Sequence, residues 1–471
     1  MKAAGKTALA LGIIGAVAVA GPYVIGLRIE SAFRAGIASI SEQSPYPIRI
    51  SRYERGLYSA EAETAIEIVL PPETHVHEEG HEDEATAAPK VVRLRLNHAI
   101  SHGPRLDGLL RLGRLITTPQ LDDDLKTSLA PLFGDLPVLT LITDLGFAGG
   151  VSGSLRSPAV DASTAGADAL KVHWAGIESS YSLGGGHLLL QLAAPSLDIT
   201  GNDGKQGSFG QLAMTADMTQ VDDSPLWIGT SAITVASLAL KSAEVTSTLN
   251  QFALNSDTQL VDGAINSGVQ FSATSFDAAG TRIDQPRLSV RFDHLDAAAT
   301  IAMSTAANRY QQTHGKDAAV DPAAMMAELK PALSQLAAGH PELRVDELSF
   351  GSPAGAVKAE GSLRYIGDAN FDDFTPLTDV EGHAQFDAPL DYVNLLLSQK
   401  VRADLAGNAG VAPDEVPQEV IASALQNTRD ALIAQGLLLV DGRQAKSVAA
   451  FKGGVLTING KALGAGVPGG G

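Results

Sequence analysis

The chain contains 471 residues with a formal net charge of −19, because 53 Asp and Glu outnumber 34 Lys and Arg. An acidic surface repels phosphate backbones, so we expect no nucleic-acid partner. Cysteine is absent, which excludes thiol catalysis, Cys-ligated zinc and Cys-held iron–sulfur clusters. Glycine is abundant at 48 residues and aromatic residues make up only 5%, a composition that favours short strands and tight turns over a helical bundle.

A long uncharged stretch near the start of the chain runs from Thr7 to Leu27. As a helix that rises ~1.5 Å per residue, it can cross the ~30 Å core of a bilayer. Lys2 and Lys6 precede it, so the positive-inside rule places the N-terminus in the cytoplasm and the main body across the membrane. The sequence therefore predicts a cytoplasmic N-terminus and transmembrane anchor over residues 1–28, with the membrane as a partner.

A cleaved signal peptide is the alternative interpretation of this stretch. Ala18-Val19-Ala20 fits a small-residue cleavage site, with cleavage after Ala20. Against it, the apolar run continues to Leu27, and Pro22 lies two residues beyond the cut. Both interpretations place the main body outside the cytoplasm.

Residues 29–135 are predicted to form a helix-hairpin region. Apolar residues at helical spacing predict a helix after the anchor, and alternating apolar residues predict strands that pair as a hairpin across an acidic connection. The elements expected here are a helix over 29–44, strands over 48–55, 61–70 and 92–102, and helical segments over 105–116 and 122–133.

From residue 136 to residue 293 the chain reads as a series of strands separated by turn signals. Val269 and Phe271 share one face of their strand, as do Leu288, Val290 and Phe292. Apolar residues at every second position fit an antiparallel meander with one face exposed to solvent.

Helices return in residues 294–463, a predicted α+β region. The segments expected are a helix from Pro322 towards Ala338, a hairpin over 343–366, helices over 390–405 and 415–435, and a closing hairpin over 448–461. Gly436 is placed to cap the last helix, and residues 464–471 form a glycine-rich tail. The fold class is therefore α+β and predominantly β: a transmembrane helix, a long antiparallel sheet that is curved or partly closed, and helices in the C-terminal part.

Four segments resemble the YdgA family of bacterial envelope proteins, long catalogued as a domain of unknown function. They are Tyr53-Glu54-Arg55-Gly56-Leu57-Tyr58-Ser59, Ile100-Ser101-His102-Gly103-Pro104, Ser352-Pro353-Ala354-Gly355 and Gly454-Val455-Leu456-Thr457-Ile458-Asn459-Gly460-Lys461. Together they frame nearly the whole chain. The resemblance implies a single-pass inner-membrane protein with a periplasmic main body, and it implies no enzyme activity.

The connection over residues 71–89 contains His77-Glu78-Glu79-Gly80-His81, a literal H-E-x-x-H motif. A zinc protease needs this motif on a helix, but the flanks lack an apolar stripe and Gly80 weakens a helix by ~1 kcal/mol. A softer hypothesis is loose binding of Zn²⁺, Ni²⁺ or Cu²⁺ by His75, His77 and His81 among acidic neighbours. The alternative is a solvated loop that binds no metal.

His98 and His102 lie on the apolar face of their predicted strand, four residues apart. They could form a ligand pair or an acid–base pair. The structural alternative, which we favour, is a pair of core histidines hydrogen-bonded to nearby backbone.

The leading functional hypothesis is a non-enzymatic role in envelope maintenance, through binding of a lipid, a polysaccharide or a protein partner. The motivation is the anchor together with the one-sided strands, because a curved sheet of this kind makes an apolar trough suited to acyl chains. The alternatives are an interaction scaffold that forms a homodimer and a periplasmic metal-dependent hydrolase. No catalytic residue and no cofactor is predicted.

Overall fold

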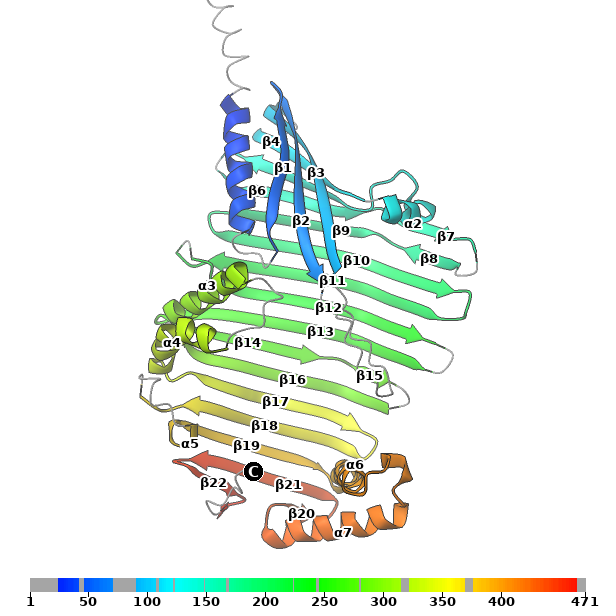
Figure 1. Ribbon diagram of the computed structural model, residues 1–471, viewed down its shortest axis with the longest axis vertical. Helices are drawn as coiled ribbons and strands as arrows, with labels where there is room; N and C mark the ends of the chain where they lie inside the picture. Colours follow the sequence, from blue (N-terminus) through cyan, green and yellow to red (C-terminus); the bar gives the residue numbers. More distant parts are fainter. Residues whose placement is uncertain are drawn as a thin grey trace, which may run out of the picture. The chain divides into compact units, whose positions relative to one another are not determined.

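The computed structural model describes residues 24–41, 46–70, 90–106, 110–121, 123–147, 149–166, 169–222, 224–242, 245–278, 281–314, 322–368 and 376–463. These residues divide between two compact units. Their helices and strands are labelled in Figure 1. Unit 1 comprises Met1–Asp203, Ala213–Trp227 and Ser304–Met325, and unit 2 comprises Gly204–Leu212, Ile228–Met303 and Met326–Gly471. The chain crosses from one unit to the other within β11 (Gln206–Gln220), α3 (Ala297–His314) and α4 (Pro322–Ala338), and also near Asp203 and Trp227.

Unit 1 is built on antiparallel strands. In chain order they are β1 (Ile48–Arg55), β2 (Ser59–Leu70), β3 (Lys90–Leu106), β4 (Leu110–Gln120), β5 (Thr140–Gly146), β6 (Val151–Ser157), β7 (Val160–Ser163), β8 (Leu170–Trp174), β9 (Ile177–Gly184) and β10 (His187–Gly201). Strands β1 to β6 pair in sequence, β6 pairs with β9, and β9 pairs with β10. The hairpin β7–β8 joins the second half of β10. The predicted antiparallel, mostly β fold is confirmed.

An N-terminal helix over residues 24–41 packs on one face of this sheet, as the sequence predicts for 29–41. Ile29 lies in a buried cluster with Ala60 and Ala62 of β2 and Ile100 of β3. The two alanines have small side chains, so the helix can approach the strands closely. Phe33 and Tyr53 pack at the margin of the cluster, with ring centroids 5.8 Å apart.

The helix expected over 105–116 is wrong, because Leu110–Gln120 forms strand β4. The spacing of Leu110, Leu112, Leu115 and Ile116 suits a helical stripe. However, β4 lies between β3 and β5 and pairs with both, so tertiary pairing overrides the local pattern. The helix expected over 122–133 is confirmed as α2 (Asp123–Phe133).

Unit 2 continues the antiparallel pattern. Its strands are β12 (Trp227–Lys241), β13 (Thr246–Val261), β14 (Ala264–Ser272), β15 (Ser275–Ala278), β16 (Thr281–Asp296), β17 (Glu342–Ser352), β18 (Gly355–Tyr365), β19 (Val380–Pro389), β20 (Leu439–Asp441), β21 (Gln444–Lys452), β22 (Val455–Ile458) and β23 (Lys461–Ala462). Both β14 and β15 bridge β13 to β16, and β16, β17, β18, β19 and β21 follow one another in the sheet. The hairpins predicted over 343–366 and 448–461 are confirmed.

The helices predicted over 390–405 and 415–435 are confirmed as α6 (Leu390–Ala409) and α7 (Gln418–Gln435). Unit 2 also contains α5 (Pro376–Asp379) and the 3₁₀ turn η2 (Pro413–Glu415), which the sequence does not single out. Gly436 ends α7 in the left-handed conformation, with φ of 73°, which confirms the predicted cap. The ring of Tyr392 on α6 meets that of Phe350 on β17 edge-on, with centroids 5.6 Å apart, so α6 covers one end of the sheet.

The predicted anchor lies almost wholly outside the described residues, which begin at residue 24. Among the helices that the structure does describe, none has the length and apolar character needed to cross a membrane.

Gly153 on β6 offers a test of the unit 1 packing. A Cβ atom there would overlap the carbonyl oxygen of Ile142 and lie 2.8 Å from the hydroxyl of Tyr181. We expect Gly153→Ala to lower the free energy of unfolding by ~3 kcal/mol, at the upper end of overpacking effects. The control is Gly36→Ala, since a Cβ at this exposed helical position meets nothing within 4 Å and should stabilise by up to ~1 kcal/mol. Urea unfolding followed by circular dichroism measures both; equal stabilities would contradict the packing described.

Candidate functional site

One face of the unit 2 sheet is apolar across seven paired strands. The register of β12, β13, β14, β16, β17, β18 and β19 aligns their residues in three rows on this face. The rows are Ile233, Leu254, Phe271, Leu288, Leu348, Ala359 and Phe386; Ser231, Ser256, Val269, Val290, Val345, Gly361 and Ala384; and Gly229, Thr258, Ser267, Phe292, Leu343, Leu363 and Gly382. We call this surface the apolar face; none of its residues is charged.

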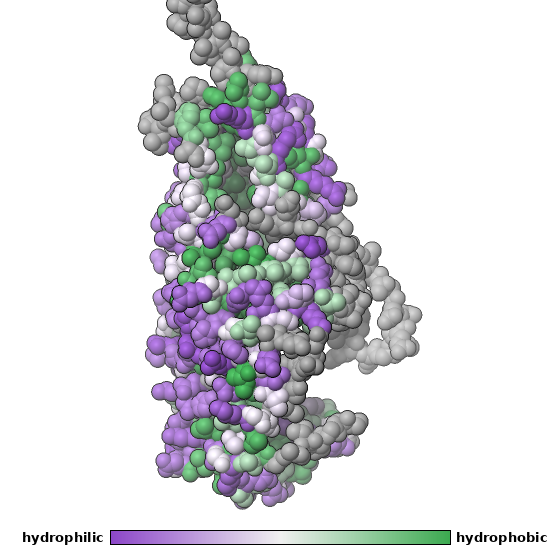
Figure 2. Space-filling model, turned by 90° about the vertical axis from the view of Figure 1, so that its left-hand side faces the viewer, coloured by the Kyte–Doolittle hydropathy of each residue, from purple (hydrophilic) through white to green (hydrophobic). Residues whose placement is uncertain are grey.

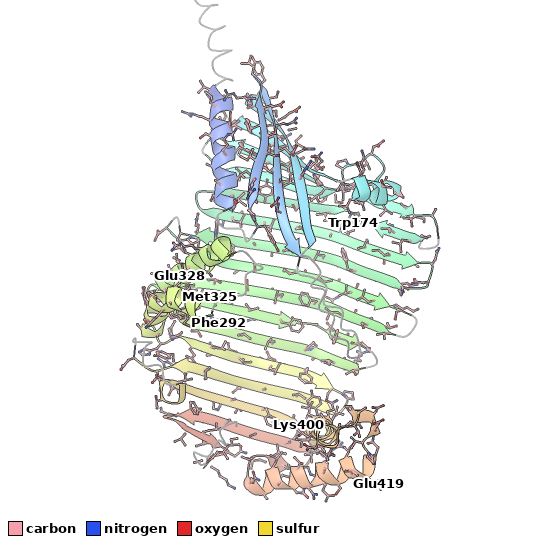
Figure 3. The ribbon with its side chains drawn as sticks, viewed as in Figure 1. Trp174, Phe292, Met325, Glu328, Lys400 and Glu419 are labelled. Carbon is pink, nitrogen blue, oxygen red and sulfur yellow. The ribbon has the colours of Figure 1, made fainter. Side chains whose placement is uncertain are left out.

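Much of the apolar face is open to solvent. The exposed fraction is 40% for Val269, 42% for Phe292 and 51% for Leu363. Leu348 is also exposed, and Phe292 projects from β16 (Figure 3). Because soluble proteins rarely leave large contiguous apolar patches in water, such a surface marks an interaction site.

The few polar atoms on this face are hydroxyls that bond to one another. The hydroxyls of Ser231 and Ser256 lie 2.7 Å apart, and those of Thr258 and Ser267 lie 3.0 Å apart. Each pair joins neighbouring strands in one row. These hydroxyls therefore have protein partners, so an apolar ligand can cover them at a low cost in lost hydrogen bonds.

The opposite face of the same strands is charged. Arg291 lies 3.6 Å from Asp257, across Gly268, where a Cβ would fall 2.7 Å from Asp257 Oδ1. Arg344 lies 3.4 Å from Asp293. In a side view, hydrophilic residues gather along one side of the middle and lower parts of the picture (Figure 2). The two faces thus differ sharply in chemistry.

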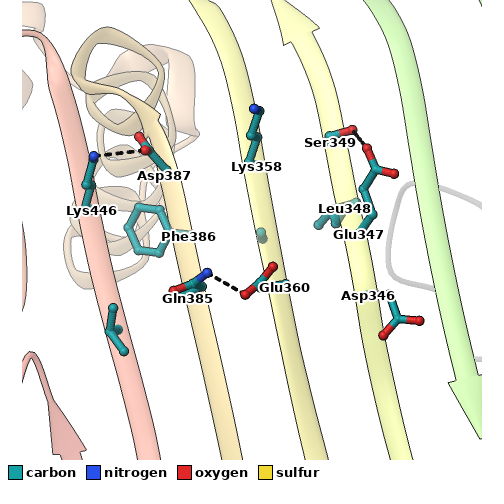
Figure 4. A pocket seen from close by; sticks show the side chains of 12 residues that line it. Asp346, Glu347, Leu348, Ser349, Lys358, Glu360, Gln385, Phe386, Asp387 and Lys446 are labelled. Carbon is teal, nitrogen blue, oxygen red and sulfur yellow. Dashed lines mark hydrogen bonds and ion pairs between the residues drawn. The ribbon is translucent and has the colours of Figure 1, made fainter.

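A cavity of about 420 Å³ lies on this charged face, over β17, β18, β19 and β21 (Figure 4). Lys446 pairs with Asp387 at 3.2 Å, and the amide of Gln385 donates to Glu360 at 2.5 Å. One pair of its charged groups, Lys446 and Asp387, is therefore neutralised within the cavity, and Glu360 accepts from a neutral amide.

The proposed metal ligands His75, His77 and His81 lie outside the described residues. Within the described part of the chain, no cluster of three or more His, Asp and Glu side chains could hold a metal ion. The loose-binding hypothesis stays a prediction.

His98 lies on β3 in unit 1, beneath the N-terminal helix, and is 5% exposed. Its ring nitrogens lie 2.9 Å from the hydroxyl of Thr64 and 2.8 Å from that of Thr117, so one nitrogen donates and the other accepts. The edge of Phe33 covers the ring. Its partners are side-chain hydroxyls, so the expectation of backbone partners is wrong. Burial lowers the pKa of His98 from 6.5 to about 4.

His102 shares the strand but has a different environment. It is 4% exposed and packs against Gly26 of the N-terminal helix, where a Cβ would lie 2.7 Å from the ring. Neither ring nitrogen has a hydrogen-bond partner among the described residues, so the expected backbone bond is wrong here too. The structure shows no direct hydrogen bond between His98 and His102, and neither bonds to a described carboxylate.

Asp144 on β5 is a buried charge that the sequence does not single out. Arg114 binds it through two hydrogen bonds, and Arg111 adds a third. Burial raises the pKa of Asp144, but the bonds from both arginines outweigh this and hold it below its usual value. The three residues come together only through the β4–β5 register, so spacing along the chain cannot reveal them.

The comparisons with known proteins identify a family to which no function is assigned. Residues 1–464 match the family described as "Bacterial protein of unknown function (DUF945)". The chain belongs to this family. No curated protein and no solved structure matches it.

The pKa of His98 predicts a pH effect on stability. Since the folded-state pKa of about 4 lies below the unfolded value of 6.5, protonation favours unfolding, and stability present above pH 6.5 falls as the pH drops towards 4. The full loss corresponds to about 3 kcal/mol. We expect His98→Gln, which can still donate and accept, to flatten this fall in urea unfolding between pH 4 and 8. His383→Gln, an exposed histidine of unit 2, should retain the fall; an unchanged slope in His98→Gln would contradict the assignment.

Proposed function

We propose that this chain is a single-pass inner-membrane protein of the YdgA type whose periplasmic main body binds the acyl chains of lipids on the apolar face. Its role would be non-enzymatic, in maintenance of the cell envelope. One observation carries the proposal: the three rows of the apolar face contain no charge, and several of their large side chains are exposed.

An acyl chain matches the chemistry of this face. Burial of each CH₂ group stabilises binding by ~0.8 kcal/mol, and the hydrogen bond between Ser231 and Ser256 lowers the cost of covering their hydroxyls. A polysaccharide needs many hydrogen-bonding groups, which this face does not offer. The polysaccharide alternative is therefore less well supported.

The hydrolase alternative gains little support from the described residues. His98 is held between two threonine hydroxyls, and His102 packs against a helix. A homodimer remains the second candidate, because Leu395 and Leu396 on α6 are 52% and 49% exposed. Exposed leucines on a helix can bind a second copy of the chain.

The structure shortens the membrane-crossing segment that the sequence predicts. Ile25 packs against the buried cluster of unit 1, so the membrane-crossing part should end near Val24. As a helix, residues 7–24 would still extend about 27 Å. This length is sufficient for a transmembrane helix.

Lipid binding can be tested with a matched pair of neighbouring substitutions. Val269 lies on the apolar face and Gln270 on the opposite face of β14, and both are exposed. We expect Val269→Lys to reduce the lipid that co-purifies with the gently extracted full chain, because an ammonium group among the rows must be desolvated. Gln270→Lys should retain the wild-type amount. Native mass spectrometry counts bound lipids and also reports any dimer.

Equal lipid content in the two variants, with both folded by circular dichroism, would contradict lipid binding on this face. A lipid-free dimer that Val269→Lys leaves intact would contradict it as well, and would favour the homodimer.

Topology gives a separate prediction. Alkaline phosphatase is active only outside the cytoplasm, so its fusion after residue 60 should be active and should stay in the membrane fraction, as Lys2 and Lys6 imply. N-terminal sequencing of the mature chain is the check on cleavage. A mature terminus at Gly21 would show that the segment is a cleaved signal peptide.

A further inference from the structure

A second cavity, of about 740 Å³, lies within unit 1 and belongs to no site described above. Its volume falls in the range of small-molecule pockets. Leu136, Ile142 and Ile177 contribute large apolar side chains, and Pro137, Pro158 and Pro195 contribute rigid ones. Leu136 is 58% exposed at the cavity.

Two opposite charges lie side by side on neighbouring strands in the lining of this cavity. The register of β5, β6, β9 and β10 aligns Thr140, Arg156, Glu178 and Ala193 in one row, and all four line the cavity. Arg156 and Glu178 are directly opposite on neighbouring strands, yet no ion pair joins them. Among the residues that the structure describes, neither side chain has a hydrogen bond or ion pair with any other, and both residues are exposed. Within this part of the chain, both charges are therefore available to a ligand.

The wall beside these charges is held in place by the fold. The corner between β8 and β9 passes through Gly176, with φ of 91°, where a Cβ would lie 2.7 Å from the carbonyl oxygen of Ser157. The indole of Trp174 (Figure 3) donates to the hydroxyl of Ser157 at 2.9 Å. Ser157 and Gly176 both line the cavity, so this wall exists before any ligand binds.

We propose that this cavity binds the headgroup of a zwitterionic phospholipid, with the phosphate on Arg156 and the ammonium group on Glu178. The glycerol and first methylene groups would then contact Ile142 and Ile177. The inference rests on the proposed function, since the ligand is again a lipid, and goes beyond it, because it adds a second site in unit 1 and names the lipid class. An anionic lipid is disfavoured, since Glu178 repels it without a compensating ammonium group.

The test compares two short-chain lipids of equal acyl length, phosphatidylethanolamine and phosphatidylglycerol, titrated below their micelle concentrations into the full chain. The first carries both charges and the second only the phosphate. We expect wild type to bind phosphatidylethanolamine about tenfold more tightly, the scale of one charge-assisted contact. Phosphoethanolamine alone tests the apolar contribution; binding as tight as that of the lipid would overturn the lipid assignment in favour of a free phosphate ester.

Two substitutions test the two charged residues one at a time. Arg156→Gln should weaken both lipids by about tenfold, whereas Glu178→Gln should weaken phosphatidylethanolamine alone and abolish the selectivity. Lys171→Gln and Asp198→Asn remove exposed charges elsewhere in unit 1 and should change neither affinity. Ala193→Phe, which fills the cavity from an exposed position, should weaken both lipids. Wild-type affinity in Arg156→Gln, or selectivity retained in Glu178→Gln, would overturn the proposal.

Failure of this proposal is distinguishable from failure of the apolar face. If the bound lipid responds to Val269→Lys and ignores Arg156→Gln, the cavity assignment is wrong and the apolar face stands. If it responds to Arg156→Gln and ignores Val269→Lys, the apolar face is wrong and the cavity assignment is supported.

Discussion

Strand register is the constraint on which both candidate sites depend. Side chains alternate between the faces of a strand, so a slip of one residue would move a whole row to the other face. In unit 2, Val269 and Val290 lie opposite each other, and so do their neighbours Gly268 and Arg291. The glycine leaves room for Arg291 to reach Asp257. A slip would place Arg291 among the valines without this partner, at the cost of an unpaired charge. The ion pairs of the charged face thus help to hold the apolar face in position.

The apolar side chains of the sheet are buried to different extents in the two units. In unit 1 the N-terminal helix covers the alanines of β2, and its Phe33 closes over His98, so the cluster is buried. In unit 2, α6 reaches one end of the sheet through Tyr392, while Val269 and Leu363 remain exposed. The alanines of β2 leave room for the N-terminal helix to approach closely. The apolar face instead presents Phe, Leu and Val in each of its rows, and several of these side chains remain in contact with solvent.

Much of the secondary structure could be predicted because its signals are local. Alternation predicted the strands now seen as β2 and β3, and Gly436 marked the end of α7. The segment now seen as β4 could not be assigned in this way: its leucines fit both periods, and only pairing with β3 and β5 decides between them. The shared faces of Val269 with Phe271 and of Leu288 with Phe292 were also visible along the chain. Their alignment into rows was not, since it depends on pairing between distant strands. The juxtaposition of Arg156 and Glu178 was hidden for the same reason.

The chemistry of the apolar face also limits what it can recognise. Acyl chains of different lipids are alike, and a surface without charges or free hydrogen-bonding groups cannot distinguish their headgroups. Discrimination requires fixed polar groups beside an apolar surface, because an unmatched charge then costs binding energy. Arg156 and Glu178 provide such a pair, and their opposite signs set the order in which a headgroup must present its own charges. The apolar face of unit 2 and the charged pair of unit 1 are therefore separate candidates, the first for binding acyl chains and the second for selecting a headgroup.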